Sequence, residues 1–152
     1  MSDVTPAIGM LVDEFSFPVD ESKVREFALA IKDPSLRYID PETAGAEGFD
    51  GVPAPLTFAV VAAHHRDAAA AVDRLGLDIS RVVVGEVAWQ YEYPVLVGDR
   101  LDGRRVVADV KSREGGRGGR MTLVTLETEL RNQRGELAVR QREVLIETGR
   151  AA

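Results

Sequence analysis

Apolar and polar positions alternate with a period of two over most of the second half of the chain. Between 81 and 93 one side carries Val87, Trp89, Tyr91 and Tyr93. Such alternation is typical of a strand with one buried face. The same reading applies to 101–112, 121–132 and 137–148, which are separated by the glycine-rich segment 113–120 and by Gly135. The pattern predicts a set of long antiparallel strands.

The N-terminal part predicts one strand and one helix. Leu11, Asp13, Phe15 and Phe17 share one side of a short strand over 10–17, which Pro18 ends. Asp20 then suits a helix N-cap. The helix after it carries an apolar stripe at helical spacing, formed by Val24, Phe27, Ala28 and Ile31.

Residues 32–52 contain several prolines and glycines, too many for a regular element of any length. We therefore expect a long irregular loop. Loops of this length are uncommon inside compact domains and are often functional. This loop is the first candidate for a site.

The most informative segment is 54–75, which predicts one long helix. Pro55 suits the first helical turn, and Gly76 suits the left-handed position after the last turn. The first half, from Leu56 to Ala63, carries no charge on any side. A helix of that kind is buried all round. A sheet must therefore wrap it, and the chain is expected to be a single α+β domain over 1–152 with an antiparallel sheet around a central helix at about 55–75.

Composition excludes several classes of function. The chain of 152 residues has no cysteine, and 19 basic against 25 acidic side chains give a net charge of −6. A general nucleic-acid binder is therefore not expected, because that affinity comes from neutralising phosphates. The sequence shows no secretion signal and no membrane span, which favours the cytoplasm. We expect no cofactor and no metal. His64 and His65 are adjacent and point about 100° apart on a helix, so one should face the core and the other the rim.

Three stretches resemble the MaoC-like (R)-hydratase and dehydratase family, which has the hot-dog fold. The family carries a G-D-x-N-P-x-H motif in the loop before the central helix, followed by D-P and then by G-F…A-H-G. The corresponding stretches here are 32–41, with Asp33, and 48–56, with Gly48-Phe49. Further on, 94–101 is similar to the family's P-V-x-x-G-D-x-L segment. The resemblance implies the hot-dog fold over nearly the whole chain.

The catalytic part of the motif is incomplete. In the family, the Asp and the His five residues later perform the proton transfers that add water to, or remove it from, a 2-enoyl thioester. Here Asp33 occupies the Asp position, but Tyr38 replaces the His and Ser35 replaces the Asn. A phenol with a pKa of about 10 exchanges protons poorly near neutral pH. No residue is therefore assigned a catalytic role.

The same departures, with an Ala-Pro-Leu-Thr-Phe helix start, resemble the non-catalytic subunit of heterodimeric (3R)-hydroxyacyl dehydratases. This resemblance implies an accessory subunit in fatty-acid or related lipid metabolism, active only with a catalytic partner chain. It implies binding of an acyl thioester of coenzyme A or of acyl carrier protein. The candidate substrate-binding residues are Asp33, Tyr38, Pro55, Leu56, Thr57 and Ala59.

Two other functions stay open on the residues alone. One is a self-sufficient hydratase or thioesterase that uses Asp33, and the other is an acyl-thioester-binding homodimer without catalysis. Trp89, Tyr91 and Tyr93 are either an acyl-binding wall or ordinary core and dimer packing. Arg113, Arg117 and Arg120 either meet phosphates or form a solvated hairpin tip. Because the apolar alternation at 81–93 has no block of charged residues and no proline before Pro94, we expect a homodimer or a heterodimer formed by joining two sheets.

Overall fold

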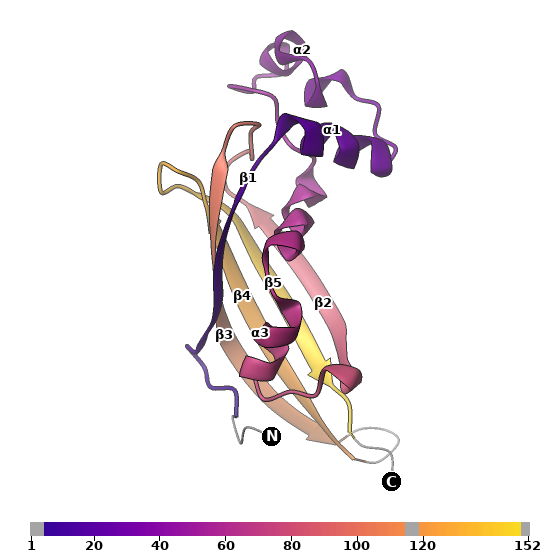
Figure 1. The fold of residues 1–152 in the computed structure, drawn as a ribbon, viewed down its shortest axis with the longest axis vertical. Coiled ribbons are helices and arrows are strands. Elements are labelled where there is room, and N and C mark those ends of the chain that lie inside the picture. Colours follow the sequence, from indigo (N-terminus) through magenta and orange to yellow (C-terminus); the bar gives the residue numbers. More distant parts are fainter. Residues whose placement is uncertain (1–4, 115–118, 150–152) are drawn as a thin grey trace.

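A computed structural model describes residues 5–114 and 119–149 of the protein. One five-stranded antiparallel sheet, in the order β1-β3-β4-β5-β2, curves behind a row of helical segments (Figure 1). Its strands are β1 (Leu11–Pro18), β2 (Val82–Tyr91), β3 (Arg100–Glu114), β4 (Arg120–Arg131) and β5 (Leu137–Glu147). All five follow the stretches that alternation predicts, and the fold is the expected α+β hot-dog. β2 is an edge strand.

The alternation in β1 changes at its start. The pairing register with β3 shifts between Leu11 and Asp13, as in a β-bulge. Val12 is fully buried although it should lie opposite Phe17, which is also fully buried. The extra residue turns both Val12 and Asp13 inward, because a bulge resets the two-residue period.

The helix after β1 forms as expected. α1 (Glu21–Ala30) begins at the N-cap Asp20, whose side chain makes no capping hydrogen bond. Val24 and Ala28 are buried, whereas Ile31 at the end of the predicted stripe is 45% exposed. The stripe is therefore narrower than the sequence suggests.

The segment 32–52 is not wholly irregular, contrary to the expectation. It contains a short 3₁₀ turn, η1 (Leu36–Tyr38), and a short helix, α2 (Pro41–Ala46). The Asp40 carboxylate accepts the Thr43 N–H at 3.0 Å, and Pro41 follows as the first helical residue. These two features start a helix between breakers. α1 and α2 project beyond one end of the sheet (Figure 1).

The expected single helix at 55–75 is broken in two. η2 (Leu56–His65) has 3₁₀ geometry, α3 (Ala68–Arg74) is α-helical, and Arg66 between them has extended backbone angles. Asp67 caps α3 through the Ala70 N–H at 2.9 Å. The end is as expected, since Gly76 has a φ of 67°, which favours glycine.

The first half of this segment is also not buried all round. Phe58, Ala59, Val61 and Ala62 are buried, but Leu56 is 69% and Val60 is 50% exposed. The reason is geometric, because one sheet of one chain covers only the side of η2 that faces it. The uncharged remainder is open to solvent in the single chain.

The break in the helix lies over a buried layer of charge between two apolar clusters. One cluster surrounds Phe17 and Phe58, and the other surrounds Leu75 and Leu126. Between them, Arg66 lies 3.9 Å from Asp13, and the guanidinium of Arg66 covers the Phe15 ring at 5.5 Å.

The other half of this charged layer comes from the sheet. Arg105, which is 4% exposed, pairs with Glu143. Burial raises the pKa of Asp13 against the lowering effect of Arg66 and Arg74. Burial likewise raises the pKa of Glu143. Arg66 thus neutralises part of a charge layer that the strands carry into the interior.

No helix in the described part of the chain is both long and apolar enough to cross a membrane.

Candidate functional site

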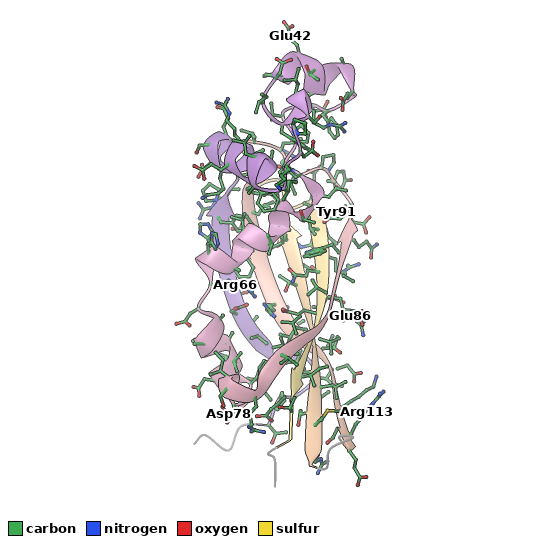
Figure 2. All side chains as sticks on the ribbon, turned by 90° about the vertical axis from the view of Figure 1, so that its right-hand side faces the viewer. Glu42, Arg66, Asp78, Glu86, Tyr91 and Arg113 are labelled. Carbon is green, nitrogen blue, oxygen red and sulfur yellow. The ribbon has the colours of Figure 1, made fainter. Side chains whose placement is uncertain are left out.

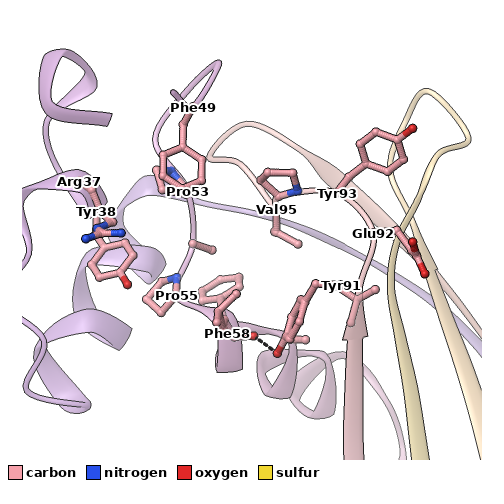
Figure 3. Close-up of a pocket in the computed structure, with 15 residues that line it drawn as sticks. Arg37, Tyr38, Phe49, Pro53, Pro55, Phe58, Tyr91, Glu92, Tyr93 and Val95 are labelled. Atoms are coloured by element: carbon pink, nitrogen blue, oxygen red, sulfur yellow. Dashed lines mark hydrogen bonds between the residues drawn. The ribbon is translucent and has the colours of Figure 1, made fainter. Parts of the chain in front are cut away.

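A cavity of about 420 Å³ opens where the end of β2 meets the segment that leads into η2. Figure 3 shows its walls, which come from the loop before η2, from η2 itself and from the 91–95 segment. The lining is mostly apolar and aromatic, as in small-molecule sites. It consists of Arg37, Tyr38, Phe49, Pro53, Ala54, Pro55, Leu56, Phe58, Ala59, Tyr91, Glu92, Tyr93, Pro94, Val95 and Val139.

Tyr38 reaches the cavity from the end of η1. Its hydroxyl points toward the space in front of Pro55 (Figure 3). Burial, and then the negative charge of Asp33, raise the pKa of Tyr38 above its ordinary value of 10. The phenol therefore keeps its proton at neutral pH and acts as a hydrogen-bond donor, not as a base.

Asp33 lies beside Tyr38 but does not line the cavity. One of its carboxylate oxygens accepts the backbone N–H of Ser35 at 3.0 Å, which closes a short turn. This bond is local, and it orients the chain toward η1. Asp33 thus forms a turn, and of these two residues only Tyr38 lines the cavity.

Arg37 holds the same loop from the other side. Its Nε donates to the Ser35 hydroxyl at 2.9 Å, and its guanidinium lies 3.1 Å from the Glu47 carboxylate. The guanidinium also covers the Tyr38 ring at 5.9 Å. Ser35, at the motif's Asn position, therefore anchors an arginine that sequence reasoning did not single out.

The start of η2 forms the opposite wall. Pro55, Leu56 and Ala59 line the cavity, whereas Thr57 is exposed and does not. The Leu56 carbonyl accepts a hydrogen bond from the Tyr91 hydroxyl (Figure 3). Of the six candidate substrate-binding residues, four are brought together at this cavity, Asp33 lies next to it, and Thr57 points elsewhere.

The aromatic residues of β2 divide in the same way. Tyr91 and Tyr93 line the cavity, while Trp89 packs against the apolar cluster around Phe17. Of the two alternatives for these aromatic residues, a cavity wall thus applies to Tyr91 and Tyr93, and core packing applies to Trp89. Cross-strand pairing accounts for the inclusion of Val139, which lies directly opposite Tyr91 on β5. This partner is set by register and leaves no signal in the local sequence.

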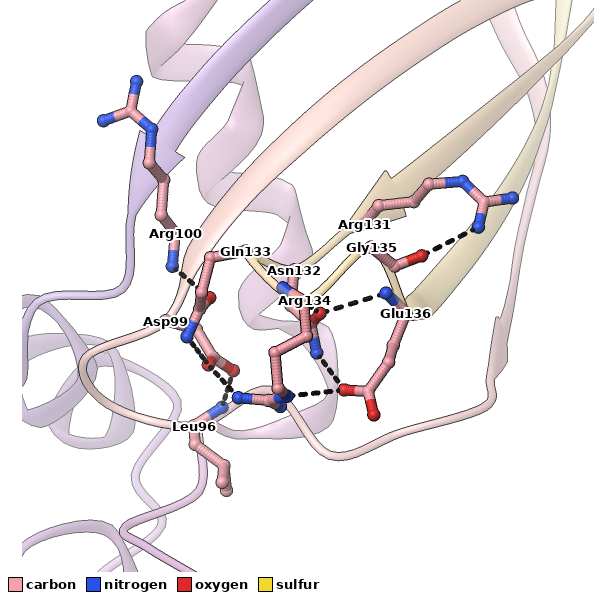
Figure 4. A network of polar contacts seen from close by, with 9 residues as sticks. All are labelled: Leu96, Asp99, Arg100, Arg131, Asn132, Gln133, Arg134, Gly135 and Glu136. Atoms are coloured by element: carbon pink, nitrogen blue, oxygen red, sulfur yellow. Dashed lines mark hydrogen bonds and ion pairs between the residues drawn. The ribbon is translucent and has the colours of Figure 1, made fainter.

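The Gly98-Asp99 pair of the family-like segment fixes the cavity's far wall. Asp99, which is 5% exposed, accepts the Leu96 N–H at 2.9 Å and the Gln133 amide at 3.1 Å (Figure 4). Gln133 lies in the turn between β4 and β5. Asp99 therefore ties the segment that carries Val95 to that turn, which is a structural role.

The remaining candidates lie away from the cavity. His64 and His65 are both exposed, but the His65 ring stacks on the fully buried Phe17 with 5.3 Å between centroids, so one histidine does face the core. Arg113 lies at the end of the sheet opposite Tyr91 (Figure 2), and Arg117 is outside the described residues. Within 5–114 and 119–149 no group of His, Asp or Glu side chains is arranged to hold a metal.

The comparison with protein families decides the classification. Residues 6–141 match the family described as FAS1-like, dehydratase domain region. The chain belongs to this dehydratase family. Its curated relatives include a UPF0336 protein of Saccharopolyspora erythraea, 38% identical over 90% of this chain and 85% of the relative. A UPF0336 protein of Thermobifida fusca is 36% identical over 89% and 86%.

Solved structures agree with this family and its fold. The chain is similar to one from the HadBC (3R)-hydroxyacyl-ACP dehydratase complex of Mycobacterium tuberculosis, with 27% identity, a TM-score of 0.72 and coverage of 95% of this chain and 98% of that one. The (R)-hydratase from A. caviae, involved in PHA biosynthesis, has 18% identity and a TM-score of 0.71, with coverage of 95% and 98%. At that identity it shows the hot-dog fold alone.

Proposed function

We propose that this member of the dehydratase family is a non-catalytic, substrate-binding subunit of a (3R)-hydroxyacyl-thioester dehydratase or enoyl hydratase. The observation that carries the proposal is Tyr38, a phenol with a raised pKa where the family's histidine would stand, in the wall of an apolar cavity. The cavity suits an acyl chain, and Tyr38 suits a hydrogen bond to the thioester end. The Tyr38 phenol supplies no base near neutral pH.

The geometry around Asp33 favours this function over a self-sufficient hydratase or thioesterase. A lone carboxylate would have to reach the substrate to act as a base or nucleophile. Asp33 instead accepts the Ser35 N–H and stays outside the cavity lining. The two histidines do not replace it, because they lie toward the far end of η2 and do not line the cavity.

The edge strand β2 supports a partner chain. Val83, Val84 and Val87 are 52%, 57% and 37% exposed on this edge, where Glu86 is the one charged residue of β2 and pairs with Arg142 of the neighbouring strand. Edges that expose apolar side chains and little charge pair with other strands. A catalytic MaoC-like chain that joins the sheet here would cover Leu56 and Val60 as well, and a second copy of this chain is the alternative. The similar chain from Mycobacterium tuberculosis described above is itself part of a complex, HadBC.

Binding without turnover is the direct test. Octanoyl coenzyme A should bind the wild-type protein by calorimetry, and Ala59→Trp should weaken binding at least tenfold, since the 3% exposed Ala59 lines the cavity and packed interiors hold no spare volume. Ala59→Leu serves if circular dichroism shows that the tryptophan variant is unfolded. Val60→Trp, on the exposed side of η2, should bind like wild type. Equal affinities for all of these proteins would contradict this location of the acyl chain.

A further inference from the structure

Tyr91 connects the edge of the sheet to the first residue of η2. It is the last residue of β2, and its hydroxyl donates to the Leu56 carbonyl at the cavity wall (Figure 3). Its ring lines the cavity together with Phe58 and Val139, which are 1% and 0% exposed. The Tyr91 side chain therefore forms part of the cavity wall and connects the β2 side of that wall to the η2 side.

Exposed apolar side chains lie beyond this connection on each of the two elements. Val60 lies further along η2 and is 50% exposed, and Val87 lies further along β2 and is 37% exposed. Val87 and Tyr91 share the face of β2 that is turned toward the helical segments, because their β5 partners Glu143 and Val139 share that face. Neither valine lines the cavity. Tyr91, which is 36% exposed, thus stands at the border between the cavity and the exposed apolar side chains beyond it.

We propose that Tyr91 sets the acyl length that this protein accepts, by closing the cavity through its hydrogen bond to the Leu56 carbonyl. The proposal rests on the acyl-thioester-binding function proposed above. A chain longer than the cavity displaces the Tyr91 ring from the Leu56 carbonyl and extends past the end of β2.

The chemistry of this contact fits such a latch. Burial raises the pKa of Tyr91, so the phenol stays protonated and keeps its donor at neutral pH. A neutral hydrogen bond at a partly exposed site contributes little net free energy. The burial of a few additional methylenes outweighs that contribution, since each strengthens binding about fourfold. The latch therefore discriminates by chain length without forming an absolute barrier.

The test measures affinity against acyl length for the purified protein, with straight-chain acyl coenzyme A thioesters from butanoyl to palmitoyl. Trp89, the only tryptophan, lies two residues from Tyr91 on the same face and reports binding by its fluorescence. Wild-type affinity should rise about fourfold per methylene and then level off. Tyr91→Phe keeps the ring and removes the donor. It should move the plateau to longer chains, and a chain two methylenes beyond the wild-type limit should gain about two- to tenfold in affinity, which is the contribution of the lost hydrogen bond.

Thr148→Val is the matched control. It also removes a hydroxyl that donates to a backbone carbonyl, that of Arg81 at 3.2 Å, and Thr148 does not line the cavity. Its plateau should equal that of wild type. Tyr91→Ala should extend the accepted length at least as far as Tyr91→Phe.

The outcomes separate the two proposals. Wild-type protein that binds no acyl coenzyme A would overturn the binding function itself. Wild-type binding with the same plateau in both Tyr91 variants would overturn the assignment of length control to Tyr91 alone. A plateau that moves in Tyr91→Ala but not in Tyr91→Phe would overturn the role of the hydrogen bond.

Discussion

Single residues decide what this dehydratase-family cavity is able to do. Tyr38 places a protonated phenol at its wall, and the Asp33 carboxylate is held in a turn by the Ser35 N–H. Neither arrangement can be inferred from residue types alone, because both depend on how the 33–38 loop folds. The sequence motif identified the positions, and the structure shows what each side chain contacts.

Lys32, next to Asp33, occupies a backbone conformation that favours glycine. Its φ is 58°, at the position after α1 where the left-handed region ends a helix. Side chains beyond glycine cost roughly 1 kcal/mol there. Lys32→Gly removes this cost, but glycine also gives the unfolded chain more conformational entropy, which offsets part of the gain. The variant should therefore raise the free energy of unfolding by about 0.5 kcal/mol.

Urea denaturation checks this prediction, with Lys23→Gly as the control. Lys23 lies inside α1, where glycine is a poor helix former, so this variant should lose about 1 kcal/mol. Destabilisation of similar size in both variants would mean that Lys32 is not strained.

At the scale of elements, the five strands were predictable from the sequence, whereas the break in the central helix expected at 55–75 was not. Period-two alternation placed all five strands, and the Gly98-Asp99 pair marked the turn before β3. Residues 64–68 contain neither proline nor glycine, and the one local sign of the break at Arg66 is Asp67, which caps α3. That break coincides with a tertiary contact to Asp13 on β1.

The candidate site was also predictable only in part. Tyr38, Pro55, Leu56 and Ala59 follow from a contiguous motif and its helix start. The lining residues Phe49, Val95 and Val139 come from separate elements that meet only in the folded chain, and no sequence spacing connects them.

Arg66→Met tests the charged layer under the helix break. Arg66 offsets the charge of the buried Asp13 and Glu143, so its removal should cost about 3 kcal/mol of stability at pH 7. The Asp13 pKa is raised above 3.8 in the folded protein, so its protonated form is retained to higher pH than in the unfolded chain. The stability lost in Arg66→Met should therefore grow as the pH rises through the pKa of Asp13 in the folded protein, and it should be smallest below pH 3.8.

Arg104→Met provides the comparison for that measurement. Arg104 lies 3.7 Å from Glu14, and both side chains are more than half exposed. Such surface pairs contribute little, so this variant should stay within about 0.5 kcal/mol of wild type at every pH. A loss for Arg66→Met that does not change with pH would contradict an electrostatic role.

For the whole molecule, the unprotected edge at β2 predicts association. We expect the purified protein to sediment as a dimer at micromolar concentration, and Val87→Lys to shift it toward the monomer by placing a charge on that edge. Ile8→Lys changes an exposed residue, 69% accessible, beside the opposite edge strand β1, and should leave the dimer intact. A wild-type monomer, or dissociation by Ile8→Lys alone, would contradict the assignment of the interface to β2.

The central claim is that this chain binds an acyl thioester but does not catalyse its hydration. The most direct measurement is the rate of crotonyl coenzyme A hydration by the purified chain alone, beside Asp33→Asn and the control Asp50→Asn, which changes an exposed carboxylate in the same loop. A general acid–base group contributes about 10²–10⁴-fold to rate, so its lack is easily detected. We predict no hydration above the blank for any of the three proteins. Robust turnover that Asp33→Asn abolishes and Asp50→Asn preserves would contradict the account.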